Sequence, residues 1–536
     1  MEERYTDIRL VKVPIEIDNK NQLTFSSLTT QYNYFNSCEH IELDDSSYQR
    51  KDNTIRYPGH IDDLIGFNYC MYKNAQYSNK WYYAFITDMR YMNDEMTLVT
   101  IKTDVWQTWW NDIEIKRSFV EREHVNDDTI GLHTIPEQLE TGEHISSGVE
   151  NLYNDNETYI CISCSDLPGD LGRSTSLRYN GVYSGTDSFL FDGAQGATNF
   201  IQAMDEDEKD LANAIVSIYL VPTSLYSGVT LNWQTITING ITTRLARIPS
   251  SDSSVLLSTS SSLTPPSSID GYTPKNNKLK VFPYSYLYVT NNAGGNAIYK
   301  YEDFINNTAQ FKTYGSLTPG CSIRTIPIDY KKLDDTSSSL KAYEYGINVG
   351  KFPVCSWSND TYTNWLTSNT VNIGFKTVGG ILGIIGGGAL MATGAGATVG
   401  AGILAGGVGM ITDSVKEIYN HSLIADQASG NTNSGDVTYS TGMNKVVAYK
   451  MNIRNEYAKV IDEFFSMFGY KVNRVKTPNI TGRTNWNYVK TIDCNIHAFI
   501  PQKDCIEIKN MFNAGVTFWH NPSTFLDYSQ TNNIAS

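Results

Sequence analysis

The chain has 536 residues, of which 40% are hydrophobic and 18% charged, a balance that excludes a disordered chain and predicts several folded lobes. A formal net charge of −15 argues against a protein that grips nucleic acid, because binding phosphates requires clustered Lys and Arg. Abundant Tyr, Thr, Ser, Asn and Gly favour strands and turns. We therefore expect a mainly β, multi-lobed protein with a few helices (α+β).

Strand patterns dominate the first 125 residues. The N-terminus, MEERYTDIRL, has no apolar stretch behind a basic start, so we expect no secretory signal and synthesis in a cytoplasm. Residues 80–110 alternate β-branched and aromatic side chains and predict two strands joined by a turn at residues 93–95. The run FVEREHV, which contains residues 121–124, is interpreted as a charged edge at a strand end rather than a catalytic pair.

From residue 126 to 270, Gly-, Ser- and Thr-rich punctuation surrounds short strands, for example at 214–222 and 234–248. Cys161 and Cys164 have C-x-x-C spacing, but no second pair or following helix supports a zinc or redox site, so we expect two small buried residues. The acidic run at 205–210 predicts a solvated face or a helix start. Residues 250–271 predict a polar loop or linker.

Helical patterns appear towards the C-terminus. After a predicted strand, turn and strand at 276–297, residues 413–429 predict a helix capped by Asp413, followed by a flexible exit at 430–436. Residues 453–469 predict the clearest helix, with Gly469 as its C-cap. Its apolar stripe, interpreted as core packing, comprises Ile453, Tyr457, Val460, Ile461, Phe464, Phe465 and Phe468. A second short helix is expected at 503–515, capped by Asp504.

No motif for catalysis, a metal or a cofactor is found. The eight histidines never pair at i, i+4, and neither a GxSxG elbow nor a GxxxxGK[ST] loop occurs. The eight scattered cysteines are expected to be reduced thiols. We therefore predict a protein that is not an enzyme and that has no cofactor.

One segment departs from this polar background. Residues 377–412, here called the apolar segment, contain no charge, and 13 of these 36 residues are glycine. Each glycine costs about 1 kcal/mol relative to alanine inside a helix, which disfavours a conventional anchor or an isolated helix in water. Three interpretations stay open at this point: a constitutive membrane anchor, a pair of buried core helices, and a sequestered membrane-active loop.

Length favours the membrane-active loop. Since a membrane-spanning helix needs roughly 20 residues, with about 17 as the lower limit, the apolar segment divides into two short spans that enter and leave on one side. Its glycines at small-xxx-small spacing would let neighbouring helices approach closely. The apolar residues expected to act on a membrane are Val378, Ile381, Leu382, Ile384, Ile385, Leu390, Met391, Val399, Ile403, Leu404, Val408, Met410 and Ile411. The glycines expected to matter are Gly379, Gly383, Gly387, Gly396, Gly400, Gly402 and Gly406.

Several blocks resemble one known family. YSNKWYYAFITDMRYMND, DVWQTWW and RSFVEREHVNDD in the first 128 residues are similar to the N-terminal part of tail-knob, or distal tail-tube, proteins of small short-tailed phages that infect Gram-positive bacteria. NNKLKVFPYSYL, EYAKVIDEFFSMFGYKVNRVKTPNITGRTNWNYVKT and IPQKDCIEIKNMFNAGVTFWHN follow in the family's order. Residues 126–270 do not match.

The resemblance implies a homohexameric, β-rich tube at the virion tail tip, through which double-stranded DNA leaves without specific binding. It implies that the apolar segment, which occupies the family's hydrophobic-loop position, plugs the lumen and later penetrates the host cell membrane. Other partners implied are proximal tail or lower collar proteins and tip or spike proteins. A tail-associated cell-wall hydrolase and a receptor-binding protein remain alternatives.

Together these observations predict five regions. They are a β-rich tube region (1–125), a divergent knob region (126–270), a second β-rich region (271–376), the apolar segment with its helix and exit (377–442), and an α+β region that closes the tube body (443–536).

Overall fold

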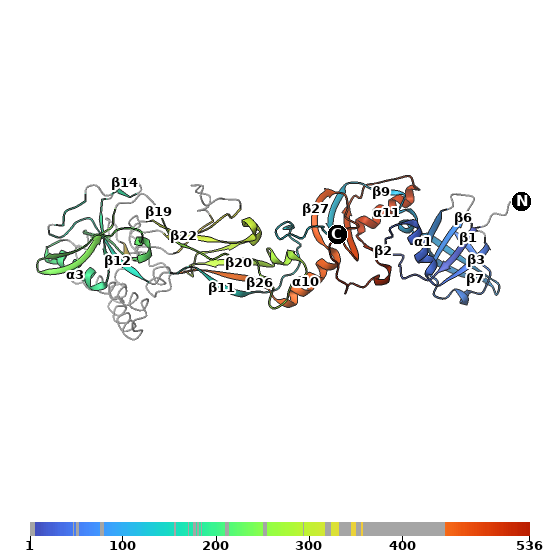
Figure 1. Cartoon of the computed structure of the whole chain (residues 1–536), viewed down its shortest axis with the longest axis horizontal. Coiled ribbons are helices and arrows are strands. Elements are labelled where there is room, and N and C mark those ends of the chain that lie inside the picture. The colour runs from blue at the N-terminus through green and yellow to red at the C-terminus, as the bar shows by residue number, and fades with distance from the viewer. Residues whose placement is uncertain are drawn as a thin grey trace, which may run out of the picture. The chain divides into compact units, whose positions relative to one another are not determined.

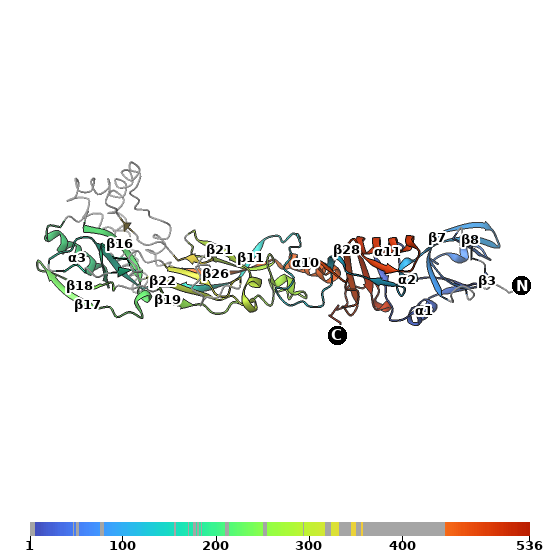
Figure 2. The same cartoon turned by 90° about the horizontal axis from the view of Figure 1, so that it is seen from above.

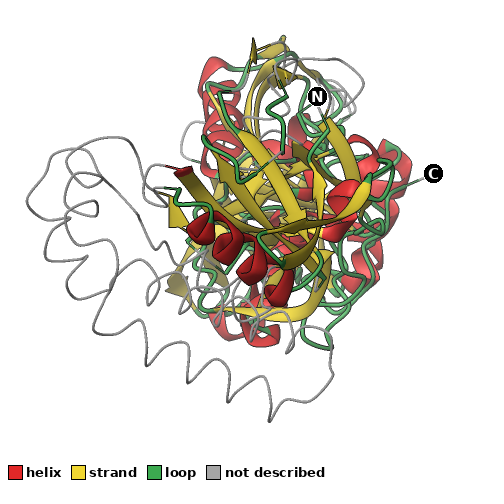
Figure 3. Ribbon diagram, turned by 90° about the vertical axis from the view of Figure 1, so that its left-hand side faces the viewer, coloured by secondary structure: helices red, strands yellow, loops and turns green. Residues whose placement is uncertain are grey.

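Strands predominate over helices in the structure, a computed structural model, which confirms the predicted mainly β fold (Figure 3). The contacts group the chain into two compact units: unit 1 contains Met1–Gly142, Gly271–Leu279 and Asn455–Ser536, and unit 2 contains Glu143–Asp270 and Lys280–Arg454. The five regions drawn from the sequence stay a prediction. The structure describes residues 6–46, 48–49, 53–74, 80–154, 157–169, 171–174, 178–179, 182–183, 185–209, 214–249, 254–292, 294–316, 323–331, 345–349, 355–356 and 445–535 (Figure 1).

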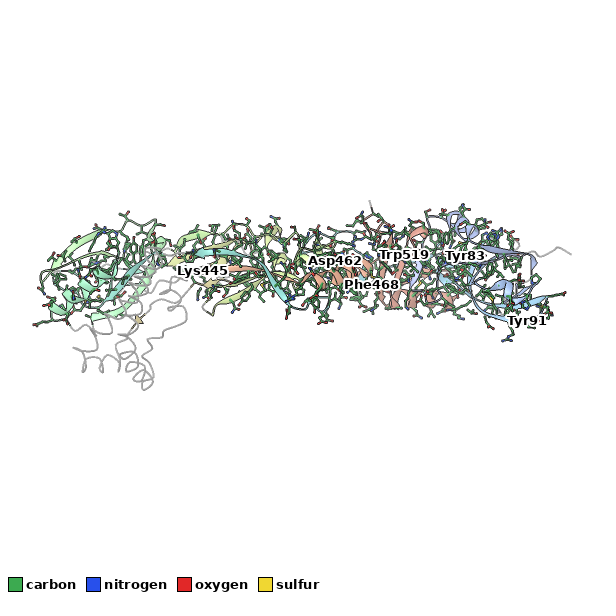
Figure 4. The ribbon with its side chains drawn as sticks, turned by 90° about the horizontal axis from the view of Figure 1, so that it is seen from below. Tyr83, Tyr91, Lys445, Asp462, Phe468 and Trp519 are labelled. Carbon is green, nitrogen blue, oxygen red and sulfur yellow. The ribbon has the colours of Figure 1, made fainter. Side chains whose placement is uncertain are left out.

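The first sheet of unit 1 is antiparallel and has the strand order β3-β1-β6-β7-β8-β5-β4. Its strands are β1 (Thr6–Val11), β3 (His40–Ser46), β4 (Tyr48–Gln49), β5 (Thr54–Tyr57), β6 (Tyr69–Asn74), β7 (Trp81–Asn93) and β8 (Met96–Thr103). The two edge strands, β3 and β4, are separated by only one residue in the chain, so the sheet curves until its two edges come close together. Ile8 and Leu10 are buried on either side of the partly exposed Arg9 and fill its core with Val99 and Ile101. The predicted hairpin is confirmed, with Tyr91 near its tip (Figure 4).

The second sheet of unit 1 joins the two ends of the chain. Its order is β2-β30-β28-β10-β27. Its strands are β2 (Asn21–Leu23), β10 (Ser118–Glu123), β27 (Tyr470–Lys476), β28 (Trp486–Ile492) and β30 (Val516–Trp519). β2 lies parallel to β30, whereas the other pairs are antiparallel. A separate two-stranded ladder pairs β9 (Ile113–Ile115) with β29 (Ile496–Ala498).

Helices of unit 1 include α1 (Leu28–Ser37), η1 (Ile61–Leu64), α2 (Val105–Trp109), α10 (Asn455–Phe468), α11 (Gln502–Ala514) and η6 (Pro522–Thr524). α2 replaces the end of the second predicted strand run, because the Asp104 carboxylate caps the N–H groups of Trp106 and Gln107. α10 is confirmed with Gly469 at φ +65° behind it. Two details of the predicted stripe are wrong: Val460 is 67% exposed, and Ile453 belongs to a strand.

α11 is confirmed, but its predicted cap is wrong. The helix begins after Pro501, and Asp504 lies in its first turn. There the Asp504 carboxylate accepts a hydrogen bond of 2.9 Å from the Trp109 indole nitrogen. The side chain therefore links α11 to α2 instead of capping its own helix.

Unit 2 contains a sandwich of two antiparallel four-stranded sheets (Figure 2). One sheet consists of β11 (His144–Asn154), β26 (Lys445–Ile453), β20 (Ser285–Thr290) and β21 (Asn296–Tyr299). The other consists of β19 (Ser254–Thr259), β22 (Phe311–Ser316), β23 (Ile323–Pro327) and β24 (Ile347–Asn348). Buried side chains such as Leu287, Val289, Phe311 and Ile323 form the core between them. The short helices η4 (Tyr301–Asp303) and η5 (Ile305–Asn307) follow β21, and η3 (Asn277–Lys280) lies where the chain passes between the units.

The other sheet of unit 2 has the order β17-β18-β15-β12-β16-β25. Its strands are β12 (Thr158–Cys164), β15 (Asp187–Phe191), β16 (Ile215–Pro222), β17 (Trp233–Ile238), β18 (Ile241–Arg247) and β25 (Cys355–Ser356). Helix α3 (Ala194–Glu206) packs Phe200 and Met204 against one face. A small ladder pairs β13 (Arg178–Tyr179) with β14 (Val182–Tyr183), and η2 (Thr223–Tyr226) follows β16.

Predictions for residues 126–297 have mixed outcomes. The strands expected at 214–222 and 234–248 are confirmed, the latter as a hairpin that turns at Asn239 and Gly240. The polar linker predicted at 250–271 is wrong in part, because β19 pairs with β22 there. The acidic run lies at the end of α3, not at a helix start, and Asp205, Glu206 and Glu208 are exposed as a solvated face requires. The strand, turn and strand expected at 276–297 are confirmed as β20 and β21, but 3₁₀ helix η3 precedes them.

Candidate functional site

All the residues predicted to act on a membrane lie outside the described residues. The same holds for the helix predicted at 413–429 and the exit predicted at 430–436. Among the helices that the structure describes, none is long and apolar enough to cross a bilayer. The structure does describe β25 and β26, the two strands that precede and follow the apolar segment in the chain.

The chain leaves the described structure from β25. This strand pairs with β16 through Cys355 opposite Ile218 and Ser356 opposite Ser217, at the edge of the six-stranded sheet. A few residues earlier β24 pairs with β23, through Asn348 opposite Arg324. The chain is therefore held by two sheets of unit 2 before the apolar segment begins.

The chain returns at Lys445, the first residue of β26 (Figure 4). β26 is an inner strand, bonded to β11 on one side and to β20 on the other. Val446 and Ala448 are fully buried in the sandwich core. Both ends of residues 357–444 are thus anchored in unit 2, as an excursion that starts and finishes on one body requires.

The charged run at residues 121–124 is not an edge, which corrects the prediction from the sequence. β10 is an inner strand between β28 and β27. The Glu123 carboxylate is buried, bonds the Lys476 ammonium, and accepts a hydrogen bond of 2.9 Å from the Asn479 N–H. Only Glu121, paired with Lys490 at 2.9 Å, behaves as the surface charge that was expected.

Buried acidic side chains tie together segments of unit 1 that are distant in sequence. Asp462 on α10 is 0% exposed and accepts hydrogen bonds from the Tyr272 hydroxyl, the Lys275 N–H, and the N–H and side-chain amide of Asn276, at 2.7–3.0 Å (Figure 4). The only indication of this burial in the sequence was the helical periodicity of residues 455–468, which places Asp462 among the core positions of α10.

Glu137 forms a second such junction. Its carboxylate bonds Arg122 and Lys278, and it also accepts a hydrogen bond of 2.9 Å from the Lys471 N–H. Burial lowers the pKa of Lys278, although the neighbouring carboxylate opposes this shift. These groups are mutually satisfied, so they hold the fold together rather than offer a reactive site.

The buried histidines also have structural partners. His124 accepts a hydrogen bond of 2.8 Å from the Tyr488 N–H through Nδ1 and donates through Nε2 to the Ser466 carbonyl oxygen. Burial lowers the pKa of His124 to about 3 and that of His520 to about 4, so both are neutral at pH 7. Neither histidine is arranged with an acid and a nucleophile as in a hydrolase.

The C-x-x-C pair is structural. Cys161 and Cys164 are buried on β12 and belong to different core clusters, so their sulfurs lie on different sides of the strand. Within the part of the chain that the structure describes, no three His, Cys, Asp or Glu side chains are grouped as metal ligands.

Comparisons with known proteins agree with the predicted family. Residues 251–533 match the family described as Bacillus phage phi29 tail knob protein gp9, C-terminal domain. Residues 4–114 match the family described as Caudoviral major tail protein N-terminus. Tail knob protein gp9 of Bacillus phage PZA is 28% identical over 96% of each chain, and that of Bacillus phage phi29 is 27% identical over 96% of each chain.

A solved structure shares the fold. The tail knob protein gp12 of bacteriophage C1 aligns over 99% of this chain and 100% of its own, with a TM-score of 0.60 and 15% identity. At that identity the likeness shows the fold alone. Because the gp9 family matches more than half of the chain, this protein belongs to the phage tail knob protein gp9 family and is a structural component of the virion tail.

Proposed function

We propose that six copies of this chain form the distal tail tube through which double-stranded DNA leaves the virion. In this proposal the apolar segment plugs the lumen before infection, then emerges and penetrates the host cell membrane. The protein is not an enzyme. It contacts proximal tail or lower collar proteins at one end of the tube and tip or spike proteins at the other.

The observation that carries the proposal is an uncharged segment tied at both ends to one folded unit. The flanking stretches are 357–376 and 413–444. At about 3.3 Å per extended residue they reach roughly 65 Å and 105 Å, which exceeds a bilayer core of about 30 Å. The apolar segment can therefore move from a lumen into a membrane while β25 and β26 stay paired.

Self-association is supported by an exposed apolar row on unit 1. Phe119 on β10 lies opposite Val475 on β27 and opposite Ile492 on β28. These three side chains are 37%, 57% and 54% exposed, although they form one continuous row across three strands. Apolar rows of this kind are typical of surfaces that other protein chains cover.

The charge of the chain supports DNA passage without specific binding. A formal net charge of −15 gives the chain an excess of acidic side chains. A lumen lined by such side chains would repel DNA phosphates within the screening length of the salt. Repulsion of phosphates is the property required of a channel through which DNA passes, whereas a DNA-binding protein requires clustered basic side chains.

A liposome dye-release assay tests membrane penetration. The wild-type chain is compared with a variant in which residues 377–412 are replaced by 36 Gly and Ser residues, which keeps the loop length. We expect release with the wild type and little release with the replacement. Equal release from both proteins would show that the apolar segment is not the membrane-active element.

Mass photometry tests the hexamer, using Phe119→Glu to place a charge in the exposed row and Ile305→Glu, at a 50% exposed position of unit 2 outside both apolar rows, as a surface control. We expect hexamers for the wild type and the control, and smaller species for Phe119→Glu. Monomers alone under every condition would contradict the tube. Release of soluble glycan from cell walls by the purified protein would instead support the hydrolase alternative.

A further inference from the structure

One outward face of the sandwich in unit 2 carries a continuous apolar row. Val149 on β11 lies opposite Tyr449 on β26, Tyr449 lies opposite Tyr288 on β20, and Tyr288 lies opposite Ile298 on β21. Side chains at paired positions of neighbouring strands lie on the same face of a sheet. Val149 and Ile298 are 54% and 49% exposed at the two ends of the row, and the rings of Tyr288 and Tyr449 lie 6.3 Å apart.

The adjoining rows on this face are also without charge. One row joins Met451 to Ser146 and Tyr286. The other joins Val447 to Asn151 and Thr290, but Val447 and Thr290 are buried, so this end of the face is already covered. We call the three rows together the uncharged face; its accessible apolar side chains are Val149, Tyr286, Tyr288, Ile298, Tyr449 and Met451. No residue of the three rows is Asp, Glu, Lys or Arg.

The opposite outward face of the same sandwich provides a comparison. Its central row contains Leu256, Tyr314, Arg324 and Asn348. Lys312 lies two residues from Tyr314 on the same strand and therefore on the same face. The two sheets share one core, yet only the β19-β22-β23-β24 sheet has charged groups on its outward face, so the sandwich itself does not require an uncharged surface.

The uncharged face has the composition of a covered surface. Tyr and Met are enriched, and charged residues depleted, at the centres of protein interfaces. Among the described residues of unit 2, the second sheet packs against the inner side of this sheet, where Leu287 and Ala448 are buried, and not against the uncharged face (Figure 1).

We propose that the uncharged face is the docking surface for the apolar segment of the same chain, which it holds until release. This inference rests on the proposed function, because it specifies where the segment is stored. The two surfaces match in chemistry: neither contains a charge that would have to be buried without a partner. The many glycines of the segment would let the tyrosine rings pack directly against its backbone.

Chain connection favours this occupant. β26, which contributes Val447, Tyr449 and Met451 to the uncharged face, is the first strand after residues 357–444. The segment is therefore tethered to the strand that crosses the middle of the face. A tether of this kind raises the effective concentration of the segment at the face, which a separate molecule would have to match.

The size of the face also favours a chain segment over a second copy. Four strands about 4.8 Å apart, with about five residues at 3.3 Å each, make a face of roughly 300 Å². A stable interface between two proteins buries about 800 Å² on each partner. The uncharged face is thus too small to hold a second copy by itself, but a tethered segment of 36 residues can occupy it with part of its length.

Hydrogen exchange measured by mass spectrometry on the full chain tests the inference. Tyr288→Glu places a charge in the middle of the uncharged face, and Tyr314→Glu is the matched control on the opposite outward face. We expect amide exchange in residues 378–411 to become at least tenfold faster in Tyr288→Glu and to stay unchanged in Tyr314→Glu. If Tyr288→Glu does not fold, as judged by circular dichroism, Tyr288→Ser is used with Tyr314→Ser.

Exchange in residues 378–411 that is the same in wild type, Tyr288→Glu and Tyr314→Glu would overturn the inference, as would equal acceleration in both variants. Liposome release measured on the same samples separates this result from the proposed function. Release by the wild type without any change of exchange in Tyr288→Glu removes the docking surface but keeps the membrane activity. Faster exchange only in Tyr288→Glu, without release by the wild type, supports the docking surface and removes the membrane activity.

Discussion

The two units bury charge to different extents. Among the described residues, unit 1 buries the charged side chains Asp104, Glu123, Glu137, Lys278 and Asp462, whereas unit 2 buries only Asp187. Unit 1 is assembled from three separate stretches of chain, and most of its buried charges lie where those stretches meet. Unit 2 joins its two stretches mainly through strand pairing, with β26 between β11 and β20.

The two units specify the pairing of their distant segments by different interactions. Backbone pairing is insensitive to side-chain identity, whereas a buried carboxylate tolerates only the donors that satisfy it. Asp462 and Glu137 both bind residues of Gly271–Leu279, the short stretch that unit 1 receives from between two parts of unit 2. We infer that these carboxylates fix that stretch in one position.

The largest effect is expected from Asp462→Ala. The change removes a buried carboxylate and leaves its donors, including the Asn276 side-chain amide, without their acceptor. We expect unit 1 to lose about 3–5 kcal/mol of unfolding free energy, measured by urea unfolding. Tyr272→Phe removes one of those hydrogen bonds and should cost about 1 kcal/mol; a loss as large as that of Asp462→Ala would show that the carboxylate is not the centre of the junction.

The next largest loss of stability is expected from a substitution on the buried face of β20, compared with one on its outward face. Leu287 is fully buried in the sandwich core, so Leu287→Ala should destabilise unit 2 by about 3 kcal/mol. Tyr288 points to the uncharged face, and Tyr288→Ala should cost less than about 1 kcal/mol when residues 377–412 are replaced by Gly and Ser. Thermal unfolding of both variants in that background provides the measurement, and equal losses would contradict the assignment of the faces.

The pH dependence of unit 1 is expected to reflect His124. Its pKa in the folded chain, about 3, lies below the ordinary value of 6.5, so the stability contributed by the neutral ring is present above pH 6.5 and lost as the pH falls towards 3. At pH 5 the loss should be about 2 kcal/mol. Urea unfolding at pH 7.5 and pH 5 should show this loss in the wild type and less of it in His124→Gln.

Asp104 provides the control of opposite sign. Burial raises its pKa from 3.8 to about 6, so its contribution to stability is present below pH 3.8 and lost as the pH rises through 6. In the wild type, the Asp104 contribution to the unfolding free energy is lost when the pH is raised. Asp104→Asn should therefore remove this loss at higher pH and leave the loss at lower pH unchanged. If both variants changed the pH profile in the same direction, burial would not be the cause of the shifts.

The smallest effect concerns a turn. Gly240 has φ +81°, and a Cβ there would meet no atom within 4 Å, so Gly240→Ala tests backbone strain alone. We expect a loss of about 1 kcal/mol from the β17–β18 hairpin, seen as a lower thermal unfolding midpoint. Gly228→Ala is the matched control, because Gly228 also has open space but no positive φ. Equal midpoints for the two variants would contradict the strain.

Local patterns in the sequence were sufficient for several elements. The β7–β8 hairpin follows from alternating apolar residues around a short turn, and α10 follows from helical spacing that ends at Gly469. The β17–β18 turn at Asn239 and Gly240 has the same local origin, since both residues tolerate positive φ. These signals lie within a few residues of the structure that they specify.

Elements that depend on distant partners were missed or misjudged. β19 contains Val255, Leu256 and Leu257 but lies within a polar, Ser-rich stretch, and its pairing with β22 could not be read from that local pattern. Residues 121–124 have the composition of a surface edge, but β27 and β28 on either side of β10 make Glu123 an inner residue. The cap expected from Asp504 is instead a contact to Trp109, nearly 400 residues away.

The family, the mainly β fold class and the presence of one uncharged, glycine-rich stretch could be predicted from the amino-acid sequence, because composition and local spacing carry that information. The pairing of β2 with β30 at the other end of the chain and the burial of Asp462 became evident in the folded structure alone. The folded structure also shows that β25 and β26, which flank residues 357–444, belong to one unit, and that Tyr288 and Tyr449 share a face. Pairing between strands hundreds of residues apart depends on the packing of the whole unit, which no local pattern records.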